Sequence, residues 1–374
     1  MQQAERGLFD LRRGHIIFLE EGDQSLLTVA VETMAAGHLS ELPELGGGRA
    51  RLLITAERAH ALDLDNPDNV ALSIQLPRQF TVSDLLSFCA APLSVLDLNS
   101  VREASRPANE LEEAALALAK AGRLLPAMLS VDCSERGSRL QSLLDDQTLL
   151  RVPADQAREL ARSREHRLQR VSEAPVPLED SEQTRFVLFR ESSGLLEHVA
   201  VVIGDPKHWP DPVPVRVHSA CLTGDLFGSL RCDCGEQLRN GVRAIREQGG
   251  GVLLYLSQEG RGIGLANKLR AYTIQDHGVD TVDADGILGF TGDGRRYEAA
   301  LDMLRQLGVK RVLLFTNNPS KVSALSGGGV TVVERRPLHG SITAHNRRYL
   351  DTKARKAGHM LDELLQDSDT AGGH

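Results

Sequence analysis

Apolar and polar positions in the first half of the chain alternate between helical and strand-like patterns. Residues 8–19 predict a short helix that runs into a buried strand, and residues 49–55 predict a strand after a glycine turn at 46–48. Residues 110–122 place leucine and alanine on one helical face and end at a glycine, a typical helix stop. Helices that alternate with strands predict an α/β (α+β) domain over residues 1–165.

The pattern breaks at residues 166–183, a polar stretch with two prolines that we interpret as an inter-domain linker. A second domain, 184–363, opens with strand-like runs and includes an amphipathic helix over 236–250. The last residues, 364–374, are polar and predict a disordered tail. A two-domain α/β (α+β) protein also suits the length of 374 residues.

Composition narrows the class of protein. No apolar run approaches the ~20 residues of a membrane span, and the N-terminus lacks the apolar segment of a signal peptide. Five cysteines, an odd number with three of them clustered, argue against a disulfide framework and for a reducing compartment. We therefore expect a cytoplasmic protein with no membrane partner.

The formal charge of −8 disfavours nucleic acid as a partner, because that affinity depends largely on neutralising phosphates. If the protein binds a polyanion, it must do so through a local basic cluster that opposes the overall sign.

Three cysteines, Cys221, Cys232 and Cys234, lie within fourteen positions in the pattern C-x10-C-x-C. Three thiolates bind zinc and leave a fourth position open for water. His218 is the only nearby candidate for a fourth protein ligand. The pattern favours a catalytic metal site; a closed structural site and reduced thiols packed in a core remain as alternatives.

Two further segments stand where α/β sheets bind ligands. Glu259, Gly260 and Arg261 follow an apolar strand and precede a helix. Residues from Thr316 to Lys321 form a strand-to-helix turn whose amide groups and lysine suit a phosphate. A plain helix cap with a solvated lysine is the alternative for the second segment.

Taken together, the second half resembles GTP cyclohydrolase II, the zinc enzyme that opens riboflavin synthesis. The matching segments run from about residue 170 to 361: RVHSACLTGD, SLRCDCG, QEGRGIGLANKLRAY, LGFTGDGRRY, TNNPSKV and YLDTKARKAGHML. The resemblance implies hydrolysis of GTP to formate, pyrophosphate and 2,5-diamino-6-ribosylamino-4(3H)-pyrimidinone 5′-phosphate. It also implies one Zn²⁺ per chain on the three cysteines, Mg²⁺ with the triphosphate, and a homodimer.

The resemblance assigns catalytic roles to three residues. Asp293 matches the proton acceptor, and Tyr272 matches a tyrosine beside the base. Arg295 matches a proposed nucleophile toward the α-phosphate, although a protonated guanidinium is better suited to clamping phosphate charge.

The remaining family positions are nucleotide contacts: Arg216, Val217, His218, Ser219, Gln237, Glu259, Gly260, Arg261, Thr281, Thr316 and Lys321. Among them, Glu259 or Gln237 is expected to read the guanine edge. Arg216, Arg261 and Lys321 provide the local basic cluster that an acidic chain needs.

Three positions depart from the family pattern. Ala220 replaces a glutamate beside Cys221, Ser257 replaces an arginine, and Gly294 stands where an acid is usual. Losses around metal ligands typically cost ~10–100-fold, so we expect altered affinity or rate and retained chemistry.

The first half resembles 3,4-dihydroxy-2-butanone 4-phosphate synthase in its opening helix and strand, in GGGRARLLITAERAHALDL and in LEEAALALAKAGRLLPAML. The family's acidic metal loop is reduced here to residues 20–23, and Leu111 stands in place of its histidine. We therefore expect a scaffold without synthase activity, in which Glu110, Glu112 and Glu113 form a solvated helix start.

The sequence suggests two other function classes. One is a non-catalytic nucleotide-binding or regulatory homologue with a structural zinc, which Ala220 and the lost synthase residues favour. The other, a zinc nucleobase deaminase, requires H-x-E and P-C-x-x-C. Residues 218–220 lack that glutamate, and the cysteine spacing differs.

Overall fold

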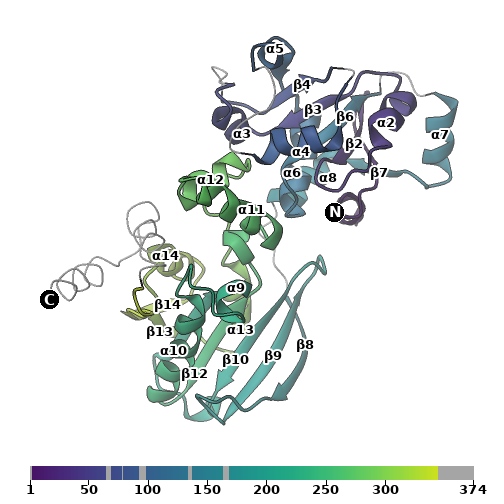
Figure 1. Cartoon of the computed structure of the whole chain (residues 1–374). Helices are drawn as coiled ribbons and strands as arrows, with labels where there is room; N and C mark the ends of the chain where they lie inside the picture. Colours follow the sequence, from purple (N-terminus) through teal and green to yellow (C-terminus); the bar gives the residue numbers. More distant parts are fainter. Residues whose placement is uncertain are drawn as a thin grey trace. The chain divides into compact units, whose positions relative to one another are not determined.

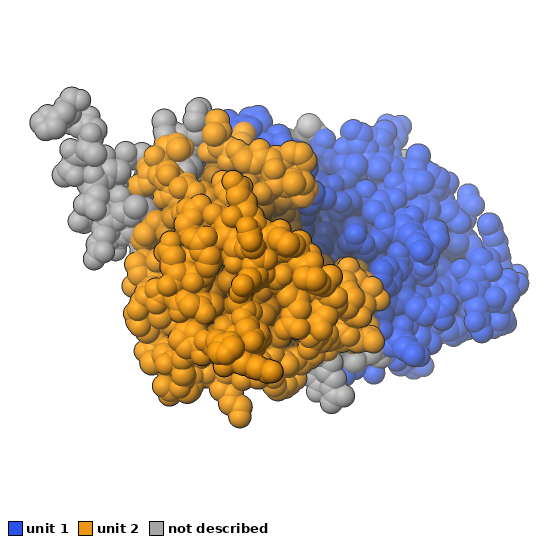
Figure 2. All heavy atoms as spheres, turned by 90° about the horizontal axis from the view of Figure 1, so that it is seen from below, with its two compact units in different colours: residues 1–163, 263–294 blue, residues 164–262, 295–374 orange. Residues whose placement is uncertain are grey.

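A computed structural model describes residues 2–64, 69–77, 79–91, 98–133, 137–162 and 168–343. The chain divides into two compact units, coloured separately in Figure 2. Unit 1 comprises residues 1–163 and 263–294, and unit 2 comprises residues 164–262 and 295–374. The second domain, expected to be continuous over 184–363, therefore contributes a segment to unit 1.

Unit 1 is built on a seven-stranded mixed sheet in the order β5-β4-β3-β6-β2-β1-β7 (Figure 1). All neighbours are antiparallel except β1 and β7, which are parallel. The strands are β1 (Ile17–Glu21), β2 (Gln24–Ala30), β3 (Arg51–Ile54), β4 (Leu72–Gln75), β5 (Ser105–Pro107), β6 (Ala127–Asp132) and β7 (Leu150–Pro153).

The helices of unit 1 include counterparts of the two expected in its first half, α1 and α6. The helices of this unit are α1 (Gln2–Arg12), α2 (His38–Gly46), α3 (Ala56–Ala61), α4 (Val82–Ala90), α5 (Leu98–Glu103), α6 (Glu110–Ala121), α7 (Ser138–Asp145), α8 (Ala154–Arg162), α11 (Leu265–Asp276) and α12 (Thr281–Ile287).

The segment 263–294 belongs to unit 1 because its apolar residues enter that unit's core. Alternate residues of β3, Leu52 and Ile54, face the same buried cluster as Ile274 of α11 and Phe290. Each fully buried side chain of this size stabilises the fold by about 1.5–3 kcal/mol. The apolar face of this segment is therefore buried against residues from the first half of the chain.

Glu112 corrects the expectation of a solvated acidic helix start. Its side chain is completely buried and accepts hydrogen bonds from Arg106 through both oxygens, at 2.7 and 2.9 Å. Ser73 also donates to it at 2.6 Å, and Asn109 completes a capping box with it at the start of α6. The carboxylate is buried because these donors replace the water it would otherwise bind.

Unit 2 is built on a second seven-stranded sheet in the order β14-β13-β11-β12-β10-β9-β8. Its strands are β8 (Leu168–Pro175), β9 (Thr184–Glu191), β10 (Glu197–Ile203), β11 (Val213–Ser219), β12 (Gly251–Leu256), β13 (Arg311–Phe315) and β14 (Thr331–Arg336). Its helices are α9 (Leu222–Asp225), α10 (Cys234–Glu247), α13 (Glu298–Gln306) and α14 (Pro319–Gly327), with 3₁₀ turns η1 (Pro206–His208) and η2 (Glu259–Gly262).

The expected linker, 166–183, differs from the observed structure. Residues 168–175 form β8, which pairs antiparallel with β9 at the edge of the second sheet. All but the first residue of β8 are exposed. Because an edge strand exposed to solvent is built from polar residues, its sequence resembles that of a linker.

The expected helix over 236–250 corresponds to α10, and none of the described helices is long and apolar enough to cross a membrane. The expected tail, 364–374, lies outside the described residues.

Candidate active site

Three parallel strands of unit 2 end at one edge of the sheet, and the candidate residues follow them. β11 pairs in parallel with both β12 and β13. Cys221 comes two residues after β11, Glu259 follows β12, and Thr316 follows β13. The carboxyl edge of parallel strands is where open α/β sheets bind ligands.

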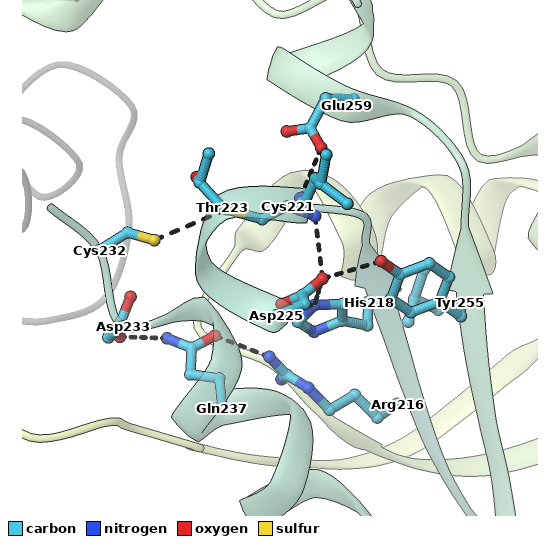
Figure 3. A network of polar contacts seen from close by, with 12 residues as sticks. Arg216, His218, Cys221, Thr223, Asp225, Cys232, Asp233, Gln237, Tyr255 and Glu259 are labelled. Atoms are coloured by element: carbon cyan, nitrogen blue, oxygen red, sulfur yellow. Dashed lines mark hydrogen bonds and ion pairs between the residues drawn. The ribbon is translucent and has the colours of Figure 1, made fainter. Parts of the chain in front are cut away.

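The three cysteines converge at this edge, as the sequence pattern predicts. Their sulfur atoms all lie within 4.8 Å of one another, and Cys221 Sγ is 3.6 Å from Cys232 Sγ. Cys221 directly precedes α9 and Cys234 begins α10. Cys232 lies in the turn between these helices, and Figure 3 labels it together with Cys221. Cys221 is buried, whereas the other two are half-buried.

Two glycines permit this convergence. A Cβ on Gly224 would lie 2.7 Å from Cys232 Sγ and 3.1 Å from Cys221 Sγ. A Cβ on Gly235 would lie 2.2 Å from the carbonyl oxygen of Gly224. Because real side chains do not approach so closely, α9 can pack on the start of α10 only with glycine at both positions.

The donor set fits a soft metal ion. The hydrogen bond that the neutral Cys232 thiol makes with Cys221 raises the pKa of Cys232, so this thiol resists ionisation when no cation is bound. A bound cation reverses this preference, because thiolates are stabilised by its charge. Three thiolates without a fourth protein ligand are the donor set of an open zinc site. Among the described residues, only these three cysteines form a group that could hold a metal ion.

Asp225 organises the surroundings of Cys221 (Figure 3). Its carboxylate accepts the backbone N–H of Cys221 at 2.9 Å, the hydroxyl of Tyr255 at 2.9 Å and Nε2 of His218 at 3.1 Å. His218 is buried and stacks on Tyr255, with ring centroids 5.6 Å apart. Because Nε2 of His218 bonds to Asp225, this nitrogen is not available to a metal. His218 therefore supports the site by holding Asp225.

Burial lowers the pKa of His218 below its usual value, although the hydrogen bond to Asp225 opposes this shift. The neutral imidazole therefore holds its proton on Nε2, toward the carboxylate.

A second row of contacts runs from β11 to the start of α10. Arg216 is 4% exposed and donates to the carbonyl of Phe315 at 3.2 Å and to Gln237 Oε1 at 2.7 Å. Gln237 in turn donates to Asp233, the residue between the two later cysteines. Burial lowers the pKa of Arg216 to about 10, and its Nε has no hydrogen-bond partner. A buried cation with an unused donor is suited to an anionic ligand.

Lys321 contradicts the alternative of a solvated lysine. It is 7% exposed, and its ammonium donates to the carbonyl of Val217 at 2.7 Å. The preceding turn is held by Thr316, whose hydroxyl accepts the N–H of Asn318 at 3.1 Å, and Asn318 caps α14. A second buried cation thus adjoins β11.

The turn after β12 has a constrained backbone. Gly260 and Arg261 both adopt left-handed conformations, with φ of 61° and 60°. Glu259 accepts the N–H of Leu222 at 2.6 Å, which ties this turn to α9. Gln258 donates to Ser219 at 3.0 Å and accepts the N–H of Arg296 at 3.0 Å. The residue after Arg295 is therefore held at the end of β11.

The structure divides the predicted site residues between the units. Unit 2 brings together the cysteines and, around β11, β12 and β13, the following residues: Arg216, Val217, His218, Ser219, Gln237, Glu259, Gly260, Arg261, Thr316 and Lys321. It also includes Arg295. Tyr272, Thr281 and Asp293 belong to unit 1. Tyr272 is half-buried on α11 with Lys268 Nζ 5.6 Å from its ring, Thr281 begins α12, and Asp293 is exposed.

Sequence reasoning missed Asp225, Tyr255 and Asp233. Asp225 had a visible signal, since an acid four residues after Cys221 can reach back to a helix N-terminus. Tyr255 had none, because its approach to Asp225 depends on the pairing of β11 with β12.

Comparisons with known proteins agree with this geometry. A family model described as GTP cyclohydrolase II matches residues 169–337. A protein named GTP cyclohydrolase-2 from Azospirillum brasilense is 42% identical over 368 residues, covering 96% of this chain and 94% of that protein. Another of that name, from Xylella fastidiosa strain 9a5c, is 38% identical over 366 residues, covering 96% and 87%.

A solved structure of RibBX, a two domain 3,4-dihydroxy-2-butanone 4-phosphate synthase from A. baumannii, is 16% identical, with a TM-score of 0.33 over 90% of this chain and 99% of that one. Likeness at this level carries no argument about function. The two relatives that span nearly the whole chain decide the assignment: this protein belongs to the GTP cyclohydrolase II family.

Proposed function

We propose that this enzyme is a zinc-dependent GTP cyclohydrolase II that converts GTP and water to formate, pyrophosphate and 2,5-diamino-6-ribosylamino-4(3H)-pyrimidinone 5′-phosphate, the first step of riboflavin biosynthesis. The observation that carries the proposal is the convergence of three cysteine sulfurs at the carboxyl edge of a parallel sheet. Two buried cations, Arg216 and Lys321, adjoin the same strands.

Cys221, Cys232 and Cys234 would hold the zinc ion, one per chain. When bound, zinc supplies Lewis-acid activation of water near neutral pH. The protein's part is to fix the three sulfurs through Gly224 and Asp225 and to engage the nucleotide with charged side chains.

Substrate recognition follows from the same edge. Arg216 and Lys321 offset the negative charge of the GTP phosphates, and Mg²⁺ arrives bound to the triphosphate. Gln237 already accepts from Arg216 and donates to Asp233. Glu259 also accepts the N–H of Leu222, but a carboxylate has further lone pairs and donates no hydrogen. We therefore assign the guanine N1–H and N2–H edge to Glu259, since a carboxylate accepts from guanine and is mismatched to adenine.

The remaining roles follow from family resemblance. Asp293 would accept a proton, Tyr272 would orient the base, and Arg295 would clamp the α-phosphate, as its permanent charge favours. Arg261, Thr281 and Thr316 would contact the nucleotide. The protein would act as a cytoplasmic homodimer, and unit 1 would have no synthase activity of its own.

The deciding experiment measures formate release from GTP and Mg²⁺ together with zinc content. Wild type should bind one zinc per chain and release formate, whereas Cys232→Ser should lose both. Cys133→Ala is the matched control, because Cys133 is a buried thiol in unit 1, outside the cluster. Asp293→Asn should keep its zinc and lose formate release.

Bound zinc without formate in the wild type would favour the second candidate, a non-catalytic nucleotide-binding homologue with a structural zinc. Incubation with ribulose 5-phosphate tests unit 1 separately. A clear yield of butanone phosphate would contradict its assignment as an inactive scaffold.

A further inference from the structure

Helices α11 and α12 lie within the residues matched by the cyclohydrolase family model, yet they are part of unit 1. In Figure 1, α12 lies beside α3 of that unit. The segment also contributes six residues to the hydrophobic core of unit 1: Ile263, Ala271, Ile274, Ala284, Leu288 and Phe290. The first half of the chain therefore supplies the buried surface on which this segment folds.

Arg58 on α3 fastens the end of α12. Its side chain is 2% exposed, and its guanidinium donates to the carbonyls of Phe88 and Ala91 and, at 2.9 Å, to that of Ile287. Within the described residues, all hydrogen bonds of the Arg58 guanidinium go to backbone carbonyls. Burying a cation is costly unless hydrogen bonds compensate for the lost water. Here the compensating bonds go to three carbonyls, so Arg58 fixes the positions of those three backbone groups. A positive charge also suits the carboxyl end of α12.

Thr55 provides a second contact at the same end. Its hydroxyl donates to the carbonyl of Gly289 at 3.0 Å and accepts the N–H of Arg58. Gly289 has φ of 83°, and a Cβ there would lie 2.7 Å from the Thr55 hydroxyl. The backbone after α12 is thus pressed against the start of α3.

The beginning of the segment is held as well. Asn267 donates to the carbonyl of Arg123 at 3.1 Å, and Arg270 donates to Glu32 at 3.1 Å. Both ends of the segment are therefore bonded to residues from the first half of the chain.

We propose that unit 1 acts as a positioning scaffold for the cyclohydrolase reaction: Thr55 and Arg58 hold the backbone of 287–289 and thereby fix the segment that carries Tyr272, Thr281 and Asp293. The proposal rests on the proposed function of those residues. Thr55 and Arg58 are positioning residues, since they act through the segment's backbone.

The test compares matched pairs of variants in the full-length protein. Thr55→Val removes a helix N-cap together with the bond to Gly289. Thr81→Val removes the N-cap of α4, another helix of unit 1, at the opposite end from the carbonyls that Arg58 binds. Thr55→Ser keeps the hydroxyl and should restore wild-type behaviour. Arg58→Met is paired with Arg106→Met, which disturbs the buried Glu112 instead.

Three quantities are measured for each variant: hydrogen exchange over residues 281–294, zinc content, and kcat and KM for formate release. Thr55→Val should speed exchange in that segment about fivefold, as expected for one lost hydrogen bond. It should also lower kcat/KM about tenfold at unchanged zinc content, because small misplacements of reacting groups are costly. Arg58→Met should have a larger effect of the same kind.

Faster exchange with unchanged kcat and KM would overturn the proposal. So would an equal loss of activity in Thr81→Val or Arg106→Met, since that would indicate general destabilisation. If Arg58→Met fails to fold, the Thr55 variants decide. A wild type that releases no formate refutes the proposed function and the catalytic half of this inference, while exchange over 281–294 still reports separately whether Thr55 and Arg58 anchor the segment.

Discussion

Asp225 connects the chemistry of the cysteine cluster to the strand that precedes it. One carboxylate accepts from the Cys221 backbone, from His218 and from Tyr255, so it ties the backbone of Cys221 to side chains of β11 and β12. Its side chain is only 5% exposed, and water cannot easily replace these donors. The orientation of Cys221 therefore depends on a residue that is not itself a ligand.

Asp225→Asn should weaken zinc binding by ~10–100-fold, the usual range for residues that orient metal ligands. The amide keeps the size of the side chain but turns two N–H groups toward donors. Competition with a chelating dye measures the affinity. Asp205→Asn is the control, because Asp205 caps the short η1 turn in the same unit and is largely exposed. An unchanged zinc affinity in Asp225→Asn would refute the positioning role.

His218 predicts a pH dependence. Burial lowers its pKa in the folded protein, so between the folded and unfolded values the unfolded chain binds more protons. Stability is therefore present above the unfolded pKa of about 6.5 and is lost as pH falls toward the folded pKa. Urea unfolding of metal-free protein should show this loss, at most about 1.4 kcal/mol per pH unit. In His218→Gln the slope should shrink; an identical slope would exclude His218 as its source.

At the scale of elements, the cluster depends on how closely α9 packs against the start of α10. Both elements are set by local sequence, but their contact is possible only because Gly224 and Gly235 have no side chains. The short α9 would be unstable alone. It is ordered by the bond from the Cys221 N–H to Asp225 and by the bond from the Leu222 N–H to Glu259.

Gly224→Ala tests this packing. The added methyl would lie 2.7 Å from Cys232 Sγ, so the sulfurs must separate or α9 must move. We expect destabilisation of about 1–3 kcal/mol, typical of overpacking, and a zinc content below one per chain. Thermal unfolding and metal analysis measure both. Gly327→Ala in α14, where a methyl meets nothing within 4 Å, should behave as wild type. Full zinc occupancy in Gly224→Ala would show that the cluster tolerates expansion.

At the scale of the whole molecule, the two units have separate hydrophobic cores. The cysteine cluster belongs to unit 2, and the described residues of unit 1 form no group that could hold a metal ion. Unit 1 is stabilised by a continuous apolar core that includes the segment 263–294. Metal removal should therefore act on one unit first.

A chelator should abolish formate release while unit 1 stays folded. Hydrogen exchange resolves this, because protection of β3 and β6 should persist when protection around α9 is lost. Re-addition of zinc should restore activity, which controls for irreversible damage. Simultaneous loss of protection in both units would mean that unit 1 depends on the metal as well.

Local patterns were sufficient for much of the fold and for the metal ligands. The strands and helices expected at 8–19, 49–55 and 110–122 were confirmed, since each has a clear apolar period. The three cysteines were recognised because all lie within fourteen positions, so their convergence requires only one short helix and one turn. The burial of Glu112 was not predicted, because its donors Ser73 and Arg106 come from strands β4 and β5.

The amino-acid sequence by itself determined which residues can bind a soft metal, which strands are buried and which family the chain resembles. These properties depend only on side-chain type and on spacings of a few residues. Only the tertiary structure decided that residues 263–294 fold against the first half of the chain. An apolar period shows that a helix face is buried without specifying its partner. The bonds from Thr55 and Arg58 to the end of α12 span more than 200 residues, a separation at which no local pattern operates.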